Sequence, residues 1–377
     1  MAHRDNEVSE IVRLLESGKS IQMLAPRRVG KTWLMRDVER QLAPHGWLTI
    51  FCDVEGMGSE DEFLRDLCRK IEDAGTVKLR VLEQIKHRLG QLMSATFEGN
   101  LANAIGRVDV KQFSDALVGS LHDNHPKVLI LVDEISLLVS ALIAKSPESA
   151  KAFLYHLRKL NQSYPNVRWL LTGSIGLDVV ARRWELGGAL LDLAIFPLEP
   201  FSAKEARAYI DALCAERRVR WHFVLDDPSF DHLAEQLGWL SPYYLDMIAD
   251  RINVQTQDAG GVAVPTKADI DRAFEELLGP SYRNYFAAWE EHLNKNFPKP
   301  ESELLYAILD CCCVRPDGET EATILASVGR NYPSLSRRNL MNLLSALVHD
   351  GFVAEVGDRW RFRSGLLRRY WMKYICT

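Results

Sequence analysis

Residues 25–32 carry the pattern with the clearest chemistry in this sequence. They read Ala-Pro-Arg-Arg-Val-Gly-Lys-Thr, one residue away from the phosphate-binding pattern G-x-x-x-x-G-K-[ST]. In such a loop, backbone N–H groups surround the β-phosphate, and the helix that follows directs its positive N-terminus at the same anion. Gly30 lets the backbone approach, Lys31 would bridge the β- and γ-phosphates, and the Thr32 hydroxyl would bind Mg²⁺. The segment therefore predicts a site for a nucleoside triphosphate.

The residues around this loop favour that interpretation over a Gly-Lys-Thr sequence that only caps a helix. Ala25 stands where the pattern has Gly, and a positive φ there would cost about 1 kcal/mol, which is tolerable. The apolar residues 21–24 predict a buried strand before the loop, and an amphipathic helix follows it. We expect the nucleotide to contact Pro26, Arg27, Arg28, Val29, Gly30, Lys31, Thr32 and Trp33.

A second motif lies about a hundred residues further along. Residues 128–135 read Val-Leu-Ile-Leu-Val-Asp-Glu-Ile, which predicts a fully buried strand that ends in two carboxylates. Asp133 would bind Mg²⁺ through water, and Glu134 would orient and deprotonate an attacking water. Such strands are common on their own, but the upstream phosphate loop favours a functional interpretation. We expect the phosphate-loop strand and this acidic strand to lie next to each other.

Two further strand ends carry polar residues that could reach the same site. The strand at 167–171 ends in Thr172-Gly-Ser174, and either hydroxyl could sense the γ-phosphate. The strand at 47–52 ends in Asp53-Val-Glu55, where the carboxylates either approach the nucleotide or only cap the next helix. A fifth strand is predicted at 190–196.

The composition of the chain limits the classes of protein to which it can belong. The net charge of −5 excludes an overall attraction to nucleic acid or to anionic membranes, so any such attraction must be local. No apolar run has the roughly 20 residues of a membrane span, and the first residues lack the apolar segment of a signal peptide, so we expect a cytoplasmic protein. The seven cysteines include no C-x-x-C pair, which favours reduced thiols over zinc sites or disulfides.

The order of predicted elements gives an α/β protein with three domains. Residues 1–200 would form a parallel-sheet nucleotide-binding core, in which 60–124 are helical and have no assigned role. Residues 201–298 would form an all-helical lid, which begins with a capping box at Ser202 and Glu205. Residues 299–377 would form a winged helix, with helices at 304–312, 321–328 and 335–349 and a hairpin at 352–363.

The terminal segment is basic within an acidic chain. Residues 330–377 hold nine Lys or Arg against three acids. Arg337 and Arg338 could enter a DNA major groove while Arg359 and Arg361 bind phosphates. The alternative is a protein-binding module whose arginines form a solvated face.

Together these parts resemble the archaeal-type ATPases of the STAND class, which are related to AAA+ proteins. The residues that carry the resemblance are Arg4-Asp-Asn-Glu7, the loop 25–32, Leu131-Val-Asp-Glu134, Leu171-Thr-Gly-Ser174, Phe196-Pro-Leu-Glu-Pro200 and Ser241-Pro242-Tyr-Tyr-Leu245. The resemblance covers almost the whole chain, and the departure at Ala25 puts the hydrolysis rate in question more than binding.

The resemblance implies an ATP-dependent switch that binds ATP or ADP with Mg²⁺ and forms oligomers in the ATP state. Pro242 would touch adenine, and Arg4 would lie near the base. The effector would be a separate chain, in a prokaryotic defence or stress system. Two alternatives are a DNA-binding ATPase resembling replication initiators or transposition helpers, and a nucleotide-binding scaffold with negligible turnover. The arginine finger stays open among Arg27, Arg28, Arg168, Arg182 and Arg183.

Overall fold

The computed structural model describes residues 4–74, 79–173, 177, 180, 184–216, 218–254, 263–297 and 299–376. Its contacts divide the chain into two compact units. The first comprises residues 1–25 and 31–198, and the second comprises residues 26–30 and 199–377. The phosphate-loop segment 26–30 thus groups with the second unit, and the predicted division of that unit at residue 298 stays a prediction.

The first unit is built on a five-stranded parallel sheet with the order β2-β3-β4-β1-β5. The strands are β1 (Ile21–Leu24), β2 (Leu48–Asp53), β3 (Val128–Asp133), β4 (Val167–Thr172) and β5 (Ala194–Pro197). All six residues of β3 are buried, because helices cover both faces of the sheet. The parallel α/β core expected from the sequence is confirmed.

Two expectations about the strands were wrong. β1 pairs with β4 and β5, so β4 separates the phosphate-loop strand from the acidic strand β3. Apolar runs reveal buried strands but do not encode their order. The fifth strand begins at Ala194 rather than at 190, because a 3₁₀ turn, η3 (Gly187–Leu190), precedes it.

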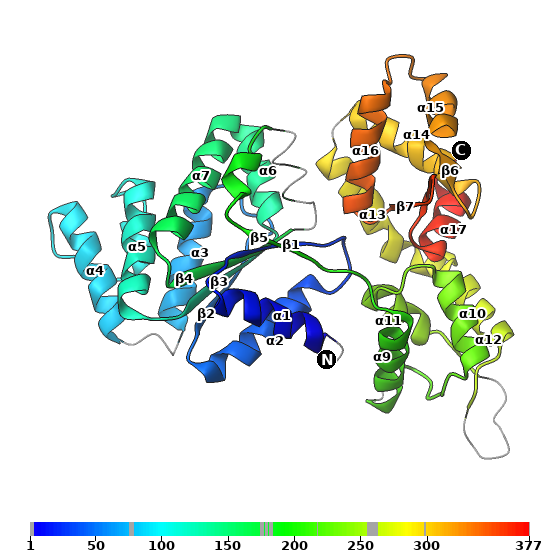
Figure 1. Ribbon diagram of the computed structural model, residues 1–377, viewed down its shortest axis with the longest axis horizontal. Coiled ribbons are helices and arrows are strands. Elements are labelled where there is room, and N and C mark those ends of the chain that lie inside the picture. The colour runs from blue at the N-terminus through cyan, green and yellow to red at the C-terminus, as the bar shows by residue number, and fades with distance from the viewer. Residues whose placement is uncertain are drawn as a thin grey trace. The chain divides into compact units, whose positions relative to one another are not determined.

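Helices flank this sheet in two groups (Figure 1). One group is α1 (Asp5–Glu16) and α2 (Lys31–Leu42), which pack together, and α2 starts directly after the phosphate loop. The other group includes α3 (Glu60–Asp73), α5 (Val110–Asn124), α6 (Ile135–Lys145) and α7 (Pro147–Ser163), with α4 (Leu79–Met93) against α5 and η2 (Leu101–Ala104) against α3. A short 3₁₀ turn, η1 (Ala43–His45), leads from α2 into β2. The helical cover predicted for 60–124 is thus formed by α3, α4, η2 and α5.

The second unit begins with helices alone. They are α9 (Ala203–Ala215), α10 (Asp227–Leu237), α11 (Pro242–Ala249), α12 (Lys267–Leu277), η4 (Pro280–Tyr282) and α13 (Arg283–Asn296). The capping box predicted at Ser202 and Glu205 is present at the start of α9. Pro242 occupies the first turn of α11, where its missing N–H costs nothing.

The chain ends in helices with a small antiparallel sheet. The order is α14 (Glu301–Cys313), β6 (Glu319–Thr320), α15 (Glu321–Gly329), α16 (Arg337–His349), β7 (Val353–Val356), β8 (Arg359–Phe362) and α17 (Gly365–Tyr374). The three strands pair in the order β6-β8-β7. Sequence reasoning missed the two-residue strand β6 and the final helix α17.

Candidate functional site

Three polar side chains meet at the carboxyl end of the sheet in the first unit. Thr32 Oγ1 donates a hydrogen bond of 2.6 Å to Asp133 Oδ2, and Thr172 Oγ1 donates one of 3.1 Å to Asp133 Oδ1. Thr32 lies in the first turn of α2, Asp133 ends β3 and Thr172 ends β4. Parallel strands place their carboxyl ends at one edge of a sheet, so residues far apart in sequence converge there. The structure therefore brings together three of the predicted site residues.

Asp133 is buried at the end of its strand. Its side chain is 2% exposed, and burial raises its pKa, while the hydrogen bonds from Thr32 and Thr172 and the charge of Lys31 oppose that rise. A buried carboxylate beside a hydroxyl is a donor set of oxygen atoms, as Mg²⁺ prefers. Among the described residues there is no group of three or more His, Cys, Asp or Glu that could hold a metal alone. The site thus fits an ion that takes one or two protein ligands and completes its shell with phosphate and water.

Lys31 is the first residue of α2 and is 7% exposed. Its Nζ lies 3.3 Å from the carbonyl oxygen of Ala25, to which it donates a hydrogen bond across the base of the loop. A buried ammonium at the N-terminus of a helix adds positive charge where the helix dipole is already positive. This arrangement favours binding of an anion.

Glu134 follows Asp133 in a left-handed backbone conformation, with φ of 60°. It occupies the N-cap position of α6, and its own N–H donates a 3.1 Å hydrogen bond to Asp133 Oδ1. A non-glycine residue in this region of φ and ψ is uncommon and marks a backbone fixed by its surroundings. At Glu134 the backbone therefore turns from β3, which ends at Asp133, into α6.

The loop itself contains two residues with positive φ, Arg28 at 66° and Gly30 at 93°. Gly30 takes this conformation without steric cost. Arg28 pays about 1 kcal/mol for its Cβ. Ala25 is not among the residues with positive φ, so the conditional cost considered for it does not arise, and the loop's non-glycine residue with positive φ is Arg28.

The other residues predicted to lie near the nucleotide belong partly to the first unit and partly to the second. Trp33 is 53% exposed on α2, and Arg4 is buried and paired with Glu7 at 2.6 Å. Arg27 is half-buried and Val29 fully buried in the loop segment. Asp53 pairs in register with Asp133 and is exposed, like Glu55. Pro26 and Pro242 belong to the second unit.

Three of the candidate residues named from the sequence cannot be placed. Ser174, Arg182 and Arg183 lie outside the described residues. Arg168 stands near the start of β4, at the opposite end of that strand from Thr172, which removes it from the cluster. Sequence reasoning gave no role to Tyr243 or Trp289, whose rings contact Arg28. No local pattern could have identified them, because aromatic residues in helices usually mark a core.

Most of the basic side chains of the terminal segment are engaged within the chain. Arg337 pairs with Glu321 at 2.5 Å, and Arg359 donates to the Gly318 carbonyl. Arg363, Arg368 and Lys373 also donate to backbone carbonyls, and Arg369 to Gln236. Six of the nine cations therefore have partners in this chain, which leaves fewer for DNA phosphates, and DNA contact stays a prediction.

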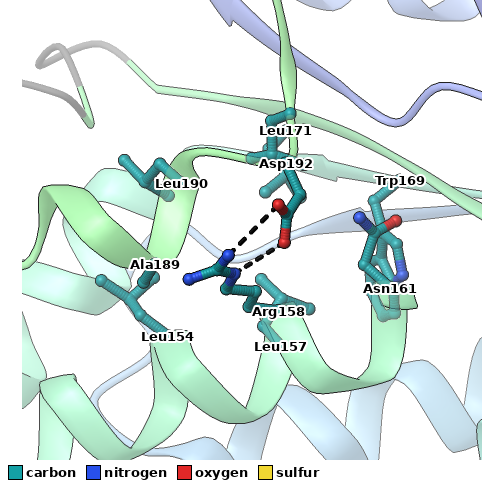
Figure 2. Close-up of a pocket in the computed structure, with 10 residues that line it drawn as sticks. Leu154, Leu157, Arg158, Asn161, Trp169, Leu171, Ala189, Leu190 and Asp192 are labelled. Carbon is teal, nitrogen blue, oxygen red and sulfur yellow. Dashed lines mark hydrogen bonds and ion pairs between the residues drawn. The ribbon is translucent and has the colours of Figure 1, made fainter. Parts of the chain in front are cut away.

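A hollow in the first unit lies elsewhere than the phosphate motifs (Figure 2). Leucines, Ala189 and Trp169 line it, and Arg158 on α7 forms an ion pair of 2.6 Å with Asp192 at its rim. Neither Lys31 nor Asp133 lines it. Its apolar wall and internally neutralised charges do not suit a triphosphate.

None of the helices in the described ranges is long and apolar enough to cross a membrane.

The chain is similar to known proteins in sequence and in structure. Residues 15–180 match the family model of an AAA domain. A Walker-type ATPase of Pyrococcus abyssi is similar in structure, with a TM-score of 0.65 at 15% identity over 97% of this chain and 95% of that one.

Two weaker structural matches are also found. The ORC2 protein of Aeropyrum pernix, solved in ADPNP and ADP complexes, has a TM-score of 0.46 at 13% identity over 100% of this chain and 96% of that one. The RuvB branch migration motor of Thermotoga maritima has a TM-score of 0.40 at 13% identity over 95% and 91%. No curated protein matches in sequence. The chain therefore has the fold of the P-loop ATPases, and its residues 15–180 are similar to the AAA domain family.

Proposed function

We propose that this protein binds ATP with Mg²⁺ at the loop 25–32 and hydrolyses it. The observation that carries the proposal is the pair of hydrogen bonds from Thr32 and Thr172 to the buried carboxylate of Asp133. Two hydroxyls and a carboxylate beside a phosphate loop are suited to a magnesium nucleotide, and a structural role alone would not require a buried carboxylate. The ORC2 structures with ADPNP and ADP are in keeping with it.

Each residue has a distinct role in this proposal. Thr32 and Asp133 would hold Mg²⁺, which when bound would neutralise charge on the phosphates. Lys31 would bind the β- and γ-phosphates. Glu134 would accept the proton of the attacking water, and Thr172 would donate a hydrogen bond to the γ-phosphate and so sense its presence.

We further propose that the reaction drives a molecular switch of the STAND type. The support is the order of elements after the sheet: helices α9 to α13, then helix, strand, two helices and a hairpin, which is the order of a winged helix. In such a switch Pro242 would contact adenine, Arg4 would lie near the base, and a separate effector protein or a second copy would bind the ATP state.

Glu134→Gln tests the hydrolytic part of the proposal. Removing the carboxylate should leave ATP affinity within about twofold of wild type and lower the phosphate-release rate by at least about a hundredfold, the usual contribution of general base catalysis. Glu55→Gln is the matched control, because Glu55 is an exposed acid beyond the end of the neighbouring strand β2. Unchanged phosphate release in the Glu134 variant would exclude Glu134 as the base.

A further inference from the structure

The loop segment 26–30 lies against other residues of the second unit at both of its ends. A Cβ placed on Gly351 would lie 3.2 Å from Cβ of Pro26, and one placed on Gly30 would lie 3.7 Å from Cγ of Pro242. Gly351 has φ of 86°, a conformation that favours glycine. The first and last residues of the segment therefore lie against fixed backbone and a rigid ring.

A further contact involves Arg28, the strained residue between these two ends. The guanidinium carbon of Arg28 lies 3.8 Å from the ring centroid of Tyr243 and 5.7 Å from that of Trp289. Both distances are within the range of a cation–π interaction. Nε of Arg28 is buried and has no hydrogen-bond acceptor among the described residues, so the face of the guanidinium carries the contact.

The two rings are themselves held in place. Tyr243 follows Pro242 at the start of α11, and its hydroxyl donates a 3.0 Å hydrogen bond to the backbone oxygen of Tyr285 on α13. Trp289, also on α13, is 1% exposed. Rigid aromatic rings partly shielded from water strengthen the attraction for a cation.

We propose that Tyr243 and Trp289 form an aromatic seat that holds Arg28, and with it the loop segment 26–30, in the curled conformation that binds the nucleotide phosphates. Arg28 occupies a backbone region that disfavours a side chain, and the contact with the seat offsets that cost. Tyr243 is then a positioning residue for nucleotide binding, without being a ligand itself. This inference rests on the proposed function.

A double-mutant cycle tests the seat, with the Kd for Mg-ATP measured by calorimetry. Tyr243→Leu should raise Kd by about three- to thirtyfold, whereas Tyr243→Phe, which keeps the ring, should stay within about twofold of wild type. In an Arg28→Gly background the loop reaches positive φ without help, so adding Tyr243→Leu should have no further effect. An equal effect of Tyr243→Leu in both backgrounds would overturn the proposal, as would no effect in either.

Controls separate this inference from the proposed function and from misfolding. Tyr285→Leu removes a 45% exposed ring on α13 and keeps the backbone oxygen that Tyr243 uses, so Kd should be unchanged. Arg28→Gln keeps a long polar side chain and removes the cation, so it should weaken Mg-ATP binding about as much as Tyr243→Leu does. It tests the same contact if Tyr243→Leu folds poorly. The seat alone is refuted if three results are found together: wild type binds Mg-ATP, Lys31→Ala does not bind it, and Arg28→Gln binds it like wild type. If wild type does not bind, the proposed function fails.

Discussion

Thr32 Oγ1 lies 2.6 Å from Asp133 Oδ2, although 101 residues separate the two in sequence. The strand before the phosphate loop, β1, does not pair with β3, which carries Asp133, because β4 lies between them. The link is made by α2, which starts at the loop and carries the Thr32 hydroxyl to the carboxylate. Thr172 on the intervening strand completes the cluster.

Asp133→Asn should abolish the increase in ATP affinity that magnesium causes. The amide retains one oxygen for the hydroxyl donors but lacks the charge that attracts the ion. Affinity without magnesium should stay within about threefold of wild type, because Lys31 and the loop are unchanged. Asp53→Asn, an exposed acid in register with Asp133 on the neighbouring strand, serves as control. A full magnesium response in the Asp133 variant would refute the assignment.

Glu60 predicts a pH dependence of stability that is separate from the site. Burial, and next the charge of Asp61, raise the pKa of Glu60 to about 6 from the ordinary 4.5. The folded state thus holds this proton more tightly than the unfolded state, so stability is lost as pH rises between about 4.5 and 6. Glu60→Gln should raise the free energy of unfolding by about 1 kcal/mol at pH 8, after allowance for partial solvation, and by little at pH 4.5.

Urea unfolding at the two pH values measures this difference directly. Glu62→Gln is the control on the same helix, α3. An equal gain from Glu60→Gln at pH 8 and pH 4.5 would mean that the gain does not come from the charge.

The terminal segment predicts a shallow salt dependence for any binding to DNA. Six of its nine cations are bound to groups of this chain, which leaves Arg330, Arg338 and Arg361. Three phosphate contacts would give a slope of log affinity against log salt of about −3, whereas nine would give about −8. Arg338→Ala should reduce the slope by about one. A slope near −8 would show that the internal pairs open to engage DNA.

Much of the fold could be predicted because its signals are local. The apolar run ending in Asp133 and Glu134 predicted a strand buried on both faces, and Ser202 with Glu205 predicted a helix start. Strand order could not be predicted, since neighbouring strands leave no mark in each other's sequence. β6 was missed because two residues show no alternation.

The same contrast holds for the site. The convergence of Thr32, Asp133 and Thr172 followed from the motifs, because parallel strands end at one edge. The contact of Arg28 with Tyr243 did not, since it joins residues more than two hundred positions apart through ring geometry. Basic residues in the terminal segment suggested a surface for phosphates, but hydrogen bonding to nearby carbonyls occupies many of them.

Calorimetric titration of Mg-ATP into wild type and Lys31→Ala tests the central claim most directly. The buried ammonium of Lys31 should account for binding, so wild type should bind with a Kd in the micromolar range and the variant should show no measurable heat of binding, with circular dichroism confirming that it is folded. Lys19→Ala, a lysine outside the loop, should bind like wild type. Retained micromolar affinity in folded Lys31→Ala would contradict the assignment of the phosphate loop.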